Sequence, residues 1–146
     1  MSSLNLRVVS AAMAIVFTGL ACSEVQAQHV TNISSVAQYT NGSVSTPGSP
    51  FGVGDSLKAE GVFFINNLAI VSITRPWEVK ISDCDDPQQK VIADGTIIVP
   101  PSSTVLFVGA ATMVASDDAE CYGADMVIWD AGLNELGTDN SLWWDN

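Results

Sequence analysis

The chain has 146 residues, contains three cysteines and is strongly acidic, with a formal net charge of −11. This length allows one domain plus processing segments. The acidity argues against nucleic acid or an anionic membrane as a partner, because both require a basic face on the protein.

Residues 1–27 have the pattern of an export signal. Arg7 gives a short positive start, residues 8–21 form an almost uninterrupted apolar run, and Val25-Gln26-Ala27 offers the small residues that signal peptidase accepts. The run is shorter than the roughly 20 apolar residues that a transmembrane helix needs. We therefore predict cleavage after Ala27, no stable membrane insertion, and a protein that is secreted or held at the cell surface.

The cysteines predict one disulfide bond. Cys22 would leave with the signal, and Cys84 and Cys121 would remain as an even pair in an exported chain. Lipidation at Cys22 is the less favoured alternative, because Gly19 stands where lipoprotein signals usually have leucine. A zinc site is not expected from two cysteines and a single distant histidine.

Residues 28–56 are rich in serine, threonine, asparagine, glycine and proline, most densely over 40–56. Repeated glycine and proline interrupt regular elements. We predict an N-terminal segment and flexible linker here, with one strand within 30–39.

From residue 57 to 146 the sequence consists of short runs typical of β-strands. Residues 77–82 show the clearest alternation, with Trp77, Val79 and Ile81 on one face. Asp94-Gly95 is read as a hairpin turn. The other expected strands lie at 61–66, 68–73, 90–93, 96–99, 104–110, 126–130 and 141–145. Seven or eight short strands predict an all-β domain, an immunoglobulin-like β-sandwich.

Three segments of this domain resemble the lamin tail domain, an immunoglobulin-like sandwich of nuclear lamins and many exported bacterial proteins. Residues 63–83 resemble its first strand, asparagine-containing turn and tryptophan-led strand. Residues 94–109 resemble its Gly-Thr, Pro-Pro and Leu-x-Val segment, and residues 133–146 its C-terminal strand. The resemblance implies a non-enzymatic module that binds or attaches to an extracellular protein or carbohydrate surface, and it implies no single ligand.

Two acidic clusters surround the two downstream cysteines. A disulfide bond would bring them together, and a cation would offset their mutual repulsion. Calcium, which takes six to eight oxygen ligands, is the candidate cofactor. The alternative, which we favour, is that both clusters are solvated loops whose aspartates bond to nearby backbone N–H groups. The candidate calcium ligands are Asp83, Asp85, Asp86, Asp117, Asp118 and Glu120.

The tryptophans suggest a second kind of site. Trp143 and Trp144 are adjacent, so in a strand one points inward and the other outward, and either is a candidate contact for a sugar ring. Trp77 and Trp129 lie on apolar faces and are predicted as core residues. Together with the acidic clusters, an exposed tryptophan gives the alternative function, a calcium-assisted carbohydrate-binding module.

A third and weaker hypothesis is a small carboxylate-dependent hydrolase. Glycoside hydrolysis uses a pair of carboxyl groups, and Glu78, Asp125 and Asp130 are candidates that nothing in the sequence selects over the other acids. No Ser-His-Asp set is expected, because the single histidine, His29, is isolated near the start of the mature chain. We therefore expect a non-enzymatic protein.

Overall fold

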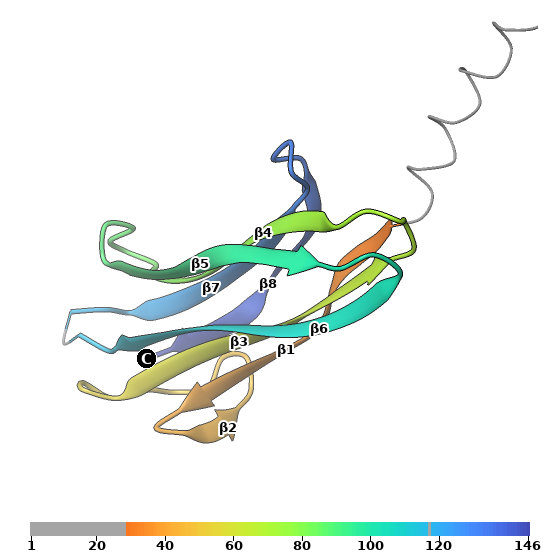
Figure 1. The fold of residues 1–146 in the computed structure, drawn as a ribbon. Helices are drawn as coiled ribbons and strands as arrows, with labels where there is room; N and C mark the ends of the chain where they lie inside the picture. Colours follow the sequence, from red (N-terminus) through yellow and green to blue (C-terminus); the bar gives the residue numbers. More distant parts are fainter. Residues whose placement is uncertain (1–28, 117) are drawn as a thin grey trace, which may run out of the picture.

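The computed structural model describes residues 29–116 and 118–146 (Figure 1). The strands in these ranges form two four-stranded antiparallel sheets. One has the order β2-β1-β3-β6 and the other the order β5-β4-β7-β8. Their bounds are β1 His29–Thr40, β2 Ser43–Ser45, β3 Ser56–Asn67, β4 Ile73–Asp83, β5 Lys90–Val99, β6 Ser103–Val114, β7 Cys121–Trp129 and β8 Glu135–Asp145.

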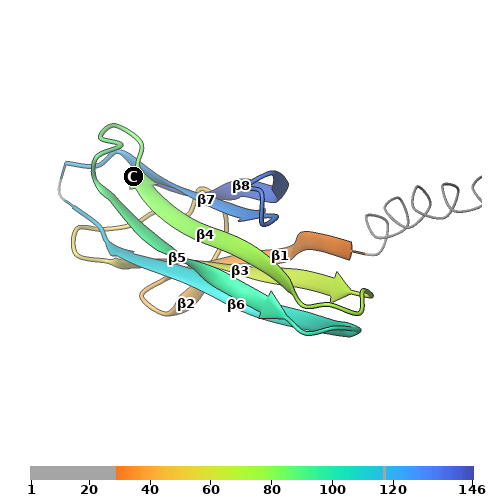
Figure 2. The same cartoon turned by 45° about the horizontal axis from the view of Figure 1, so that its top comes forward.

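The predicted all-β sandwich is confirmed, and the two sheets appear as separate layers in Figure 2. The chain passes from one sheet to the other between β3 and β4, between β5 and β6, and between β6 and β7, as the Greek-key connections of immunoglobulin-like sandwiches do. The predicted signal and Cys22 lie outside the described residues. No helix within the described ranges is long and apolar enough to span a lipid bilayer.

The core lies between the inward faces of the two sheets. In β3 every second residue from Leu57 to Asn67 is buried, so this strand alternates over its whole length. Side chains of this face meet those of β4 and β7 from the opposite sheet, where Val79, Ile81 and Ile128 are fully buried. Burial of such side chains is the main stabilising contribution to a sandwich of this size.

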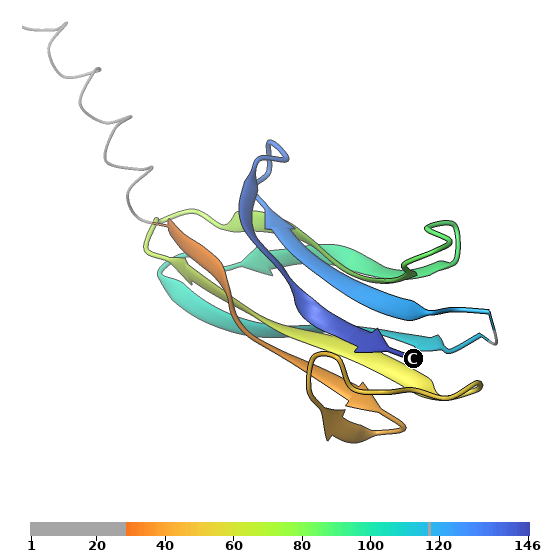
Figure 3. The same ribbon diagram turned by 180° about the vertical axis from the view of Figure 1, so that it is seen from behind.

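A flexible linker was expected over residues 28–56, but from His29 onward the structure has strands and packed turns there. The strand expected within 30–39 is present as β1, and it pairs with β3 from His29 opposite Asn67 to Thr40 opposite Leu57. Figure 3 shows β1 beside β8, so this first strand is an integral part of the sandwich. The folded domain therefore includes residues 29–56, not only 57–146.

The segment after β2 also packs onto the domain. The amide of Gly48 donates a hydrogen bond of 2.9 Å to the carbonyl of Trp143, Ser49 forms a bridge with Trp144, and Phe51 is buried against the ring of Tyr122. The glycines and prolines make turns, as expected, but these turns carry an aromatic anchor into the core.

Residues 68–71 form a loop where a strand was expected. The fully buried side chain of Asn67 explains the difference, because its amide donates to the carbonyls of Val71 at 2.9 Å, Pro100 at 2.9 Å and Val99 at 3.2 Å. These bonds hold the backbone without a partner strand. The exposed side chains of Leu68 and Ile70 leave the apolar run on the surface.

The predicted turn at Asp94-Gly95 is also absent, since β5 continues through it and pairs with β4 from Lys90 to Val99. Gly95 lies opposite Trp77, and a Cβ atom there would be 3.1 Å from the indole nitrogen. Glycine inside a strand often marks such a close approach.

A second close approach, at Gly109, gives a stability prediction. Its missing side chain faces the cluster of Phe63, Trp77 and Phe107, and an added Cβ would lie 2.7 Å from Trp77 and 2.9 Å from Phe63. We expect Gly109→Ala to lower the free energy of unfolding by about 3 kcal/mol, because overpacking forces ring and backbone shifts. Urea unfolding followed by circular dichroism measures it.

Gly123→Ala is the matched control. Gly123 also lies within a strand, and apart from its two chain neighbours no residue has an atom within 4 Å of the position that an added methyl group would take. Its effect should stay within about 0.5 kcal/mol. Equal losses in the two variants would show that the cost comes from the strand backbone and not from the aromatic cluster.

Candidate functional site

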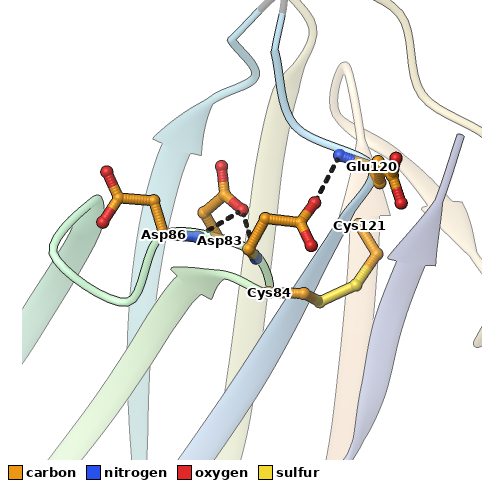
Figure 4. The surroundings of a disulfide bond; sticks show 6 residues. Asp83, Cys84, Asp86, Glu120 and Cys121 are labelled. Atoms are coloured by element: carbon orange, nitrogen blue, oxygen red, sulfur yellow. Dashed lines mark hydrogen bonds between the residues drawn. A yellow bond between two sulfur atoms is a disulfide. The ribbon is translucent and has the colours of Figure 1, made fainter.

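The predicted disulfide between Cys84 and Cys121 is confirmed, with Cα atoms 5.4 Å apart (Figure 4). It joins the loop after β4 to the first residue of β7. The backbone reinforces the junction, because the amide of Cys84 donates to the carbonyl of Cys121 at 3.1 Å. A disulfide of this kind suggests an oxidising compartment.

The carboxylates around the bridge bond to loop backbone. Asp83 is buried, and its Oδ1 accepts hydrogen bonds from the amides of Asp85 at 2.8 Å and Asp86 at 3.2 Å. Oδ1 of Asp86 accepts from the amide of Gln88 at 3.0 Å, and Oδ2 of Asp85 accepts from that of Glu120 at 3.3 Å. As Figure 4 shows, the bonds to Asp83 close one loop, and the bond from the amide of Glu120 connects it to the other.

The clusters do not form a metal site in the part of the chain that the structure describes. No three His, Cys, Asp or Glu side chains gather there in a way that would hold an ion. Asp118 and Glu120 are exposed, and Asp117 lies outside the described residues. The carboxylates of Asp83, Asp85 and Asp86 act as acceptors for loop amides, as the solvated-loop interpretation describes. The calcium set, which includes Asp117, stays a prediction.

The two adjacent tryptophans point in opposite directions, as expected. Trp144 is fully buried, and its Nε1 donates to Oγ1 of Thr40 at 3.1 Å. It is a core residue, so its prediction as a ligand contact is corrected. Trp143 is 45% exposed and remains available on the surface.

A pocket of about 450 Å³ lies on the outer face of the sheet β5-β4-β7. The strand register creates it, because Pro76 pairs with Thr96, Glu78 pairs with Asp94, and the pairing of Trp77 with Ile128 sets Trp129 beside Pro76. Its lining residues are Pro76, Trp77, Glu78, Asp94, Gly95, Thr96, Trp129 and Leu133.

Trp129 was expected in the core, and the structure instead places it at this pocket, half-buried. The sequence does contain a signal for this position. In the run Met126 to Trp129, the buried residues are Met126 and Ile128, so strict alternation puts Trp129 on the outer face with Val127.

One wall of the pocket is a rigid turn between β7 and β8. Oδ1 of Asp130 accepts from the amides of Gly132 at 2.8 Å and Asn134 at 2.9 Å, and the side-chain amide of Asn134 donates to Oδ2 at 2.9 Å. The hydrogen bonds from Asn134, first its side chain and then its backbone, lower the pKa of Asp130 below its ordinary value.

The turn holds Leu133 in an uncommon conformation. Its φ is 62°, a left-handed value that is unfavourable for a bulky residue, and its side chain is 71% exposed. Strain of this kind persists only where the surrounding structure imposes it, and it clusters at binding sites. The fold thus presents an apolar side chain to solvent beside Trp129.

The three candidate carboxylates of the hydrolase hypothesis have different contacts in the structure. Glu78 lines the pocket. Asp125 forms an ion pair of 2.7 Å with Lys80, and Asp130 is used by the turn. The acid that accompanies Glu78 in the pocket is Asp94, its partner on β5, which the sequence did not single out.

No protein-family model matches the chain, and no curated protein matches its sequence. The resemblance to the lamin tail domain therefore stays a prediction based on its three motifs. Among solved structures, the chain is similar to a calcium-binding mutant of Bacteroides uniformis beta-glucuronidase 2, with a TM-score of 0.49 and 12% sequence identity. The match covers 75% of this chain and 14% of that chain.

Proposed function

We propose that the protein is an exported, non-enzymatic module that binds a neutral carbohydrate in the pocket on the outer face of β5-β4-β7. One observation carries the proposal: a preformed pocket in which the indole of Trp129 and the side chain of Leu133 lie beside the carboxyl groups of Glu78 and Asp94.

The chemistry of the lining suits a sugar. Pyranose rings have one face of C–H groups, which packs on an indole, and a rim of hydroxyls, which donate strong hydrogen bonds to carboxylates. The volume of about 450 Å³ falls in the usual range of small-molecule pockets, roughly 300–1,000 Å³. The two acids and the net charge of −11 repel anionic sugars.

Two further features support a binding role. The hydrogen-bonded turn at Asp130 fixes the pocket wall before the ligand arrives, which reduces the entropy lost on binding. The lamin-tail resemblance implies binding or attachment and not catalysis. The predicted export signal and the disulfide both suit a module that acts outside the cytoplasm.

We expect Trp129→Ala to weaken binding of a neutral oligosaccharide roughly tenfold or more, because it removes the aromatic stacking surface. Isothermal titration calorimetry against a panel of neutral gluco-, manno-, xylo- and chito-oligosaccharides identifies the ligand and measures the loss. Trp143→Ala is the matched control, since Trp143 is also an exposed tryptophan but does not line the pocket.

Other results of these experiments would contradict the sugar site or favour one of the two alternative functions. Equal losses in the two variants, or no binding across the panel, would contradict the pocket as a sugar site. Loss of binding in excess chelator would favour the calcium-assisted module. Release of new reducing ends from the oligosaccharide would favour the hydrolase, with Glu78 and Asp94 as its carboxyl pair.

A further inference from the structure

The four edge strands of the sandwich differ in how they are protected against pairing with another chain. An edge strand exposes backbone N–H and C=O groups, and proteins protect such edges with short length, charged side chains, proline or register irregularities. The edges in the described sheets are β2 and β6 in one sheet and β5 and β8 in the other.

Three of these edges carry a protective feature. β2 has three residues, which is too short to template another strand, and the part of β1 that it leaves uncovered has an irregular register with β3 between Ile33 and Ser35. β5 carries the charges of Lys90 and Asp94. β8 carries three acids, its register with β7 is irregular at two places, and the segment at Gly48 and Ser49 bonds to its backbone.

β6 has none of these features along its twelve residues, Ser103–Val114. It contains no charged residue and no proline, and its register with β3 is unbroken from Asn67 opposite Ser103 to Ser56 opposite Val114. Within the described residues it pairs with β3 alone. Its outward side chains Leu106 and Val108 are exposed, so the edge is long, regular and apolar.

We propose that β6 pairs antiparallel with β6 of a second copy of this chain, forming a two-fold symmetric dimer with one continuous eight-stranded sheet.

The charges on the edge strands allow a second copy to pair along β6, in preference to β5 or β8. Two chains of net charge −11 repel each other over most of their surfaces. Self-pairing of β8 would bring its acids together, and near-full overlap of β5 with itself would set Asp94 opposite the partner's Asp94, which destabilises cross-strand pairs. Self-pairing of β6 brings no charges together. Because the other three edges are protected, the assembly closes at two copies and does not extend into a fibre.

The alternation of side chains fixes the centre of the dimer. Outer-face residues of one strand must lie opposite outer-face residues of the other. One residue therefore lies directly opposite its own copy, and the two-fold axis passes between these two. With the two strands overlapping almost fully, that residue is Val108 or its neighbour Gly109. With the axis at Val108, Val108 lies opposite the partner's Val108 and Leu106 opposite the partner's Ala110. With the axis at Gly109, Val108 lies opposite the partner's Ala110 and Leu106 opposite the partner's Thr112.

Sedimentation equilibrium of the chain from residue 28 to 146, from low micromolar to near-millimolar concentration in about 150 mM salt, tests the proposal. We expect a dimer for the wild type. Val108→Lys should weaken dimerisation roughly a hundredfold, because it sets like charges together at the axis. Ile98→Lys is the matched control, because the side chain of Ile98 is also apolar and exposed, at 69% against 53% for Val108. Ile98 lies on β5, away from the proposed interface. It should leave the dimer intact.

A second measurement does not depend on the lysine variant. Oxidation should cross-link Val108→Cys with itself if the axis passes through Val108, or with Ala110→Cys if it passes through Gly109. Either cross-link supports the proposal. Three results would overturn it: a monomeric wild type at the highest concentration, a dimer unaffected by Val108→Lys, or no cross-link in either cysteine experiment. Binding of an extended peptide from another protein to β6 would not rescue the proposal in any of these cases.

Discussion

Replacing both Cys84 and Cys121 with serine is expected to lower the free energy of unfolding by about 4 kcal/mol. The bridge spans a sequence separation of 37 residues, and in the chain-entropy model its loss returns that much conformational freedom to the unfolded chain. For a domain of this size the melting temperature should fall by roughly 10–20 °C. Differential scanning calorimetry of the oxidised wild type and the double variant measures the change.

Reduction of the wild type provides the control for this prediction. If the bridge acts through the unfolded chain, the reduced wild type should melt close to the double variant, since both have the same open loop. A double variant as stable as the oxidised wild type would mean that the hydrogen bond from Cys84 to Cys121 and the aspartate-capped loop hold this end of the sandwich without the covalent link.

Trp144→Ala should have an effect of similar size, about 3–5 kcal/mol, because it empties the site of the largest fully buried side chain. It also leaves the hydroxyl of Thr40 without its indole partner. Urea unfolding of the variant, followed by far-ultraviolet circular dichroism, gives the loss directly.

Trp143→Ala is the informative comparison, because the two residues are neighbours of the same type. Its exposed side chain should contribute less than about 1 kcal/mol. Trp144→Phe should fall between them, since it keeps most of the packing and removes the hydrogen bond. A larger loss at Trp143 than at Trp144 would contradict the inward and outward assignment of the two rings.

The fold was largely predictable because its signals are local. The period of two at Trp77, Val79 and Ile81 depends only on side chains of one strand, and all three lie in or against the core. The disulfide followed from counting the cysteines that would remain after the predicted signal cleavage. Neither inference requires knowledge of which strands are neighbours.

The errors came from residues whose role depends on distant partners. Glycine and proline in 40–56 correctly indicated turns, but they gave no sign that Phe51 would reach the core. Gly95 looked like a hairpin turn because glycine permits one, whereas its role is to leave room for the indole of Trp77. The run 68–71 depends on the hydrogen bonds of a single buried side chain, Asn67.

The pocket was missed for a related reason. Its lining comes largely from β4, β5 and β7, and only the strand register shows that Glu78 and Asp94 are opposite each other while Trp129 lies beside Pro76. The acidic clusters suggested a calcium site because their carboxylates are dense in the sequence. In the structure, the carboxylates of Asp83 and Asp86 accept hydrogen bonds from amides of their own loop, and that of Asp85 accepts one from Glu120.

The two ends of the described sandwich also determine how it would respond to a mechanical load. His29 pairs with Asn67 at one end, whereas the amide of Asn146 bonds to Glu120 at the other, and the two ends lie apart in Figure 3. Tension applied to these two ends would pull β1 and β8 along their lengths. Backbone hydrogen bonds perpendicular to that force must break together, and the disulfide would keep the chain between its cysteines from extending.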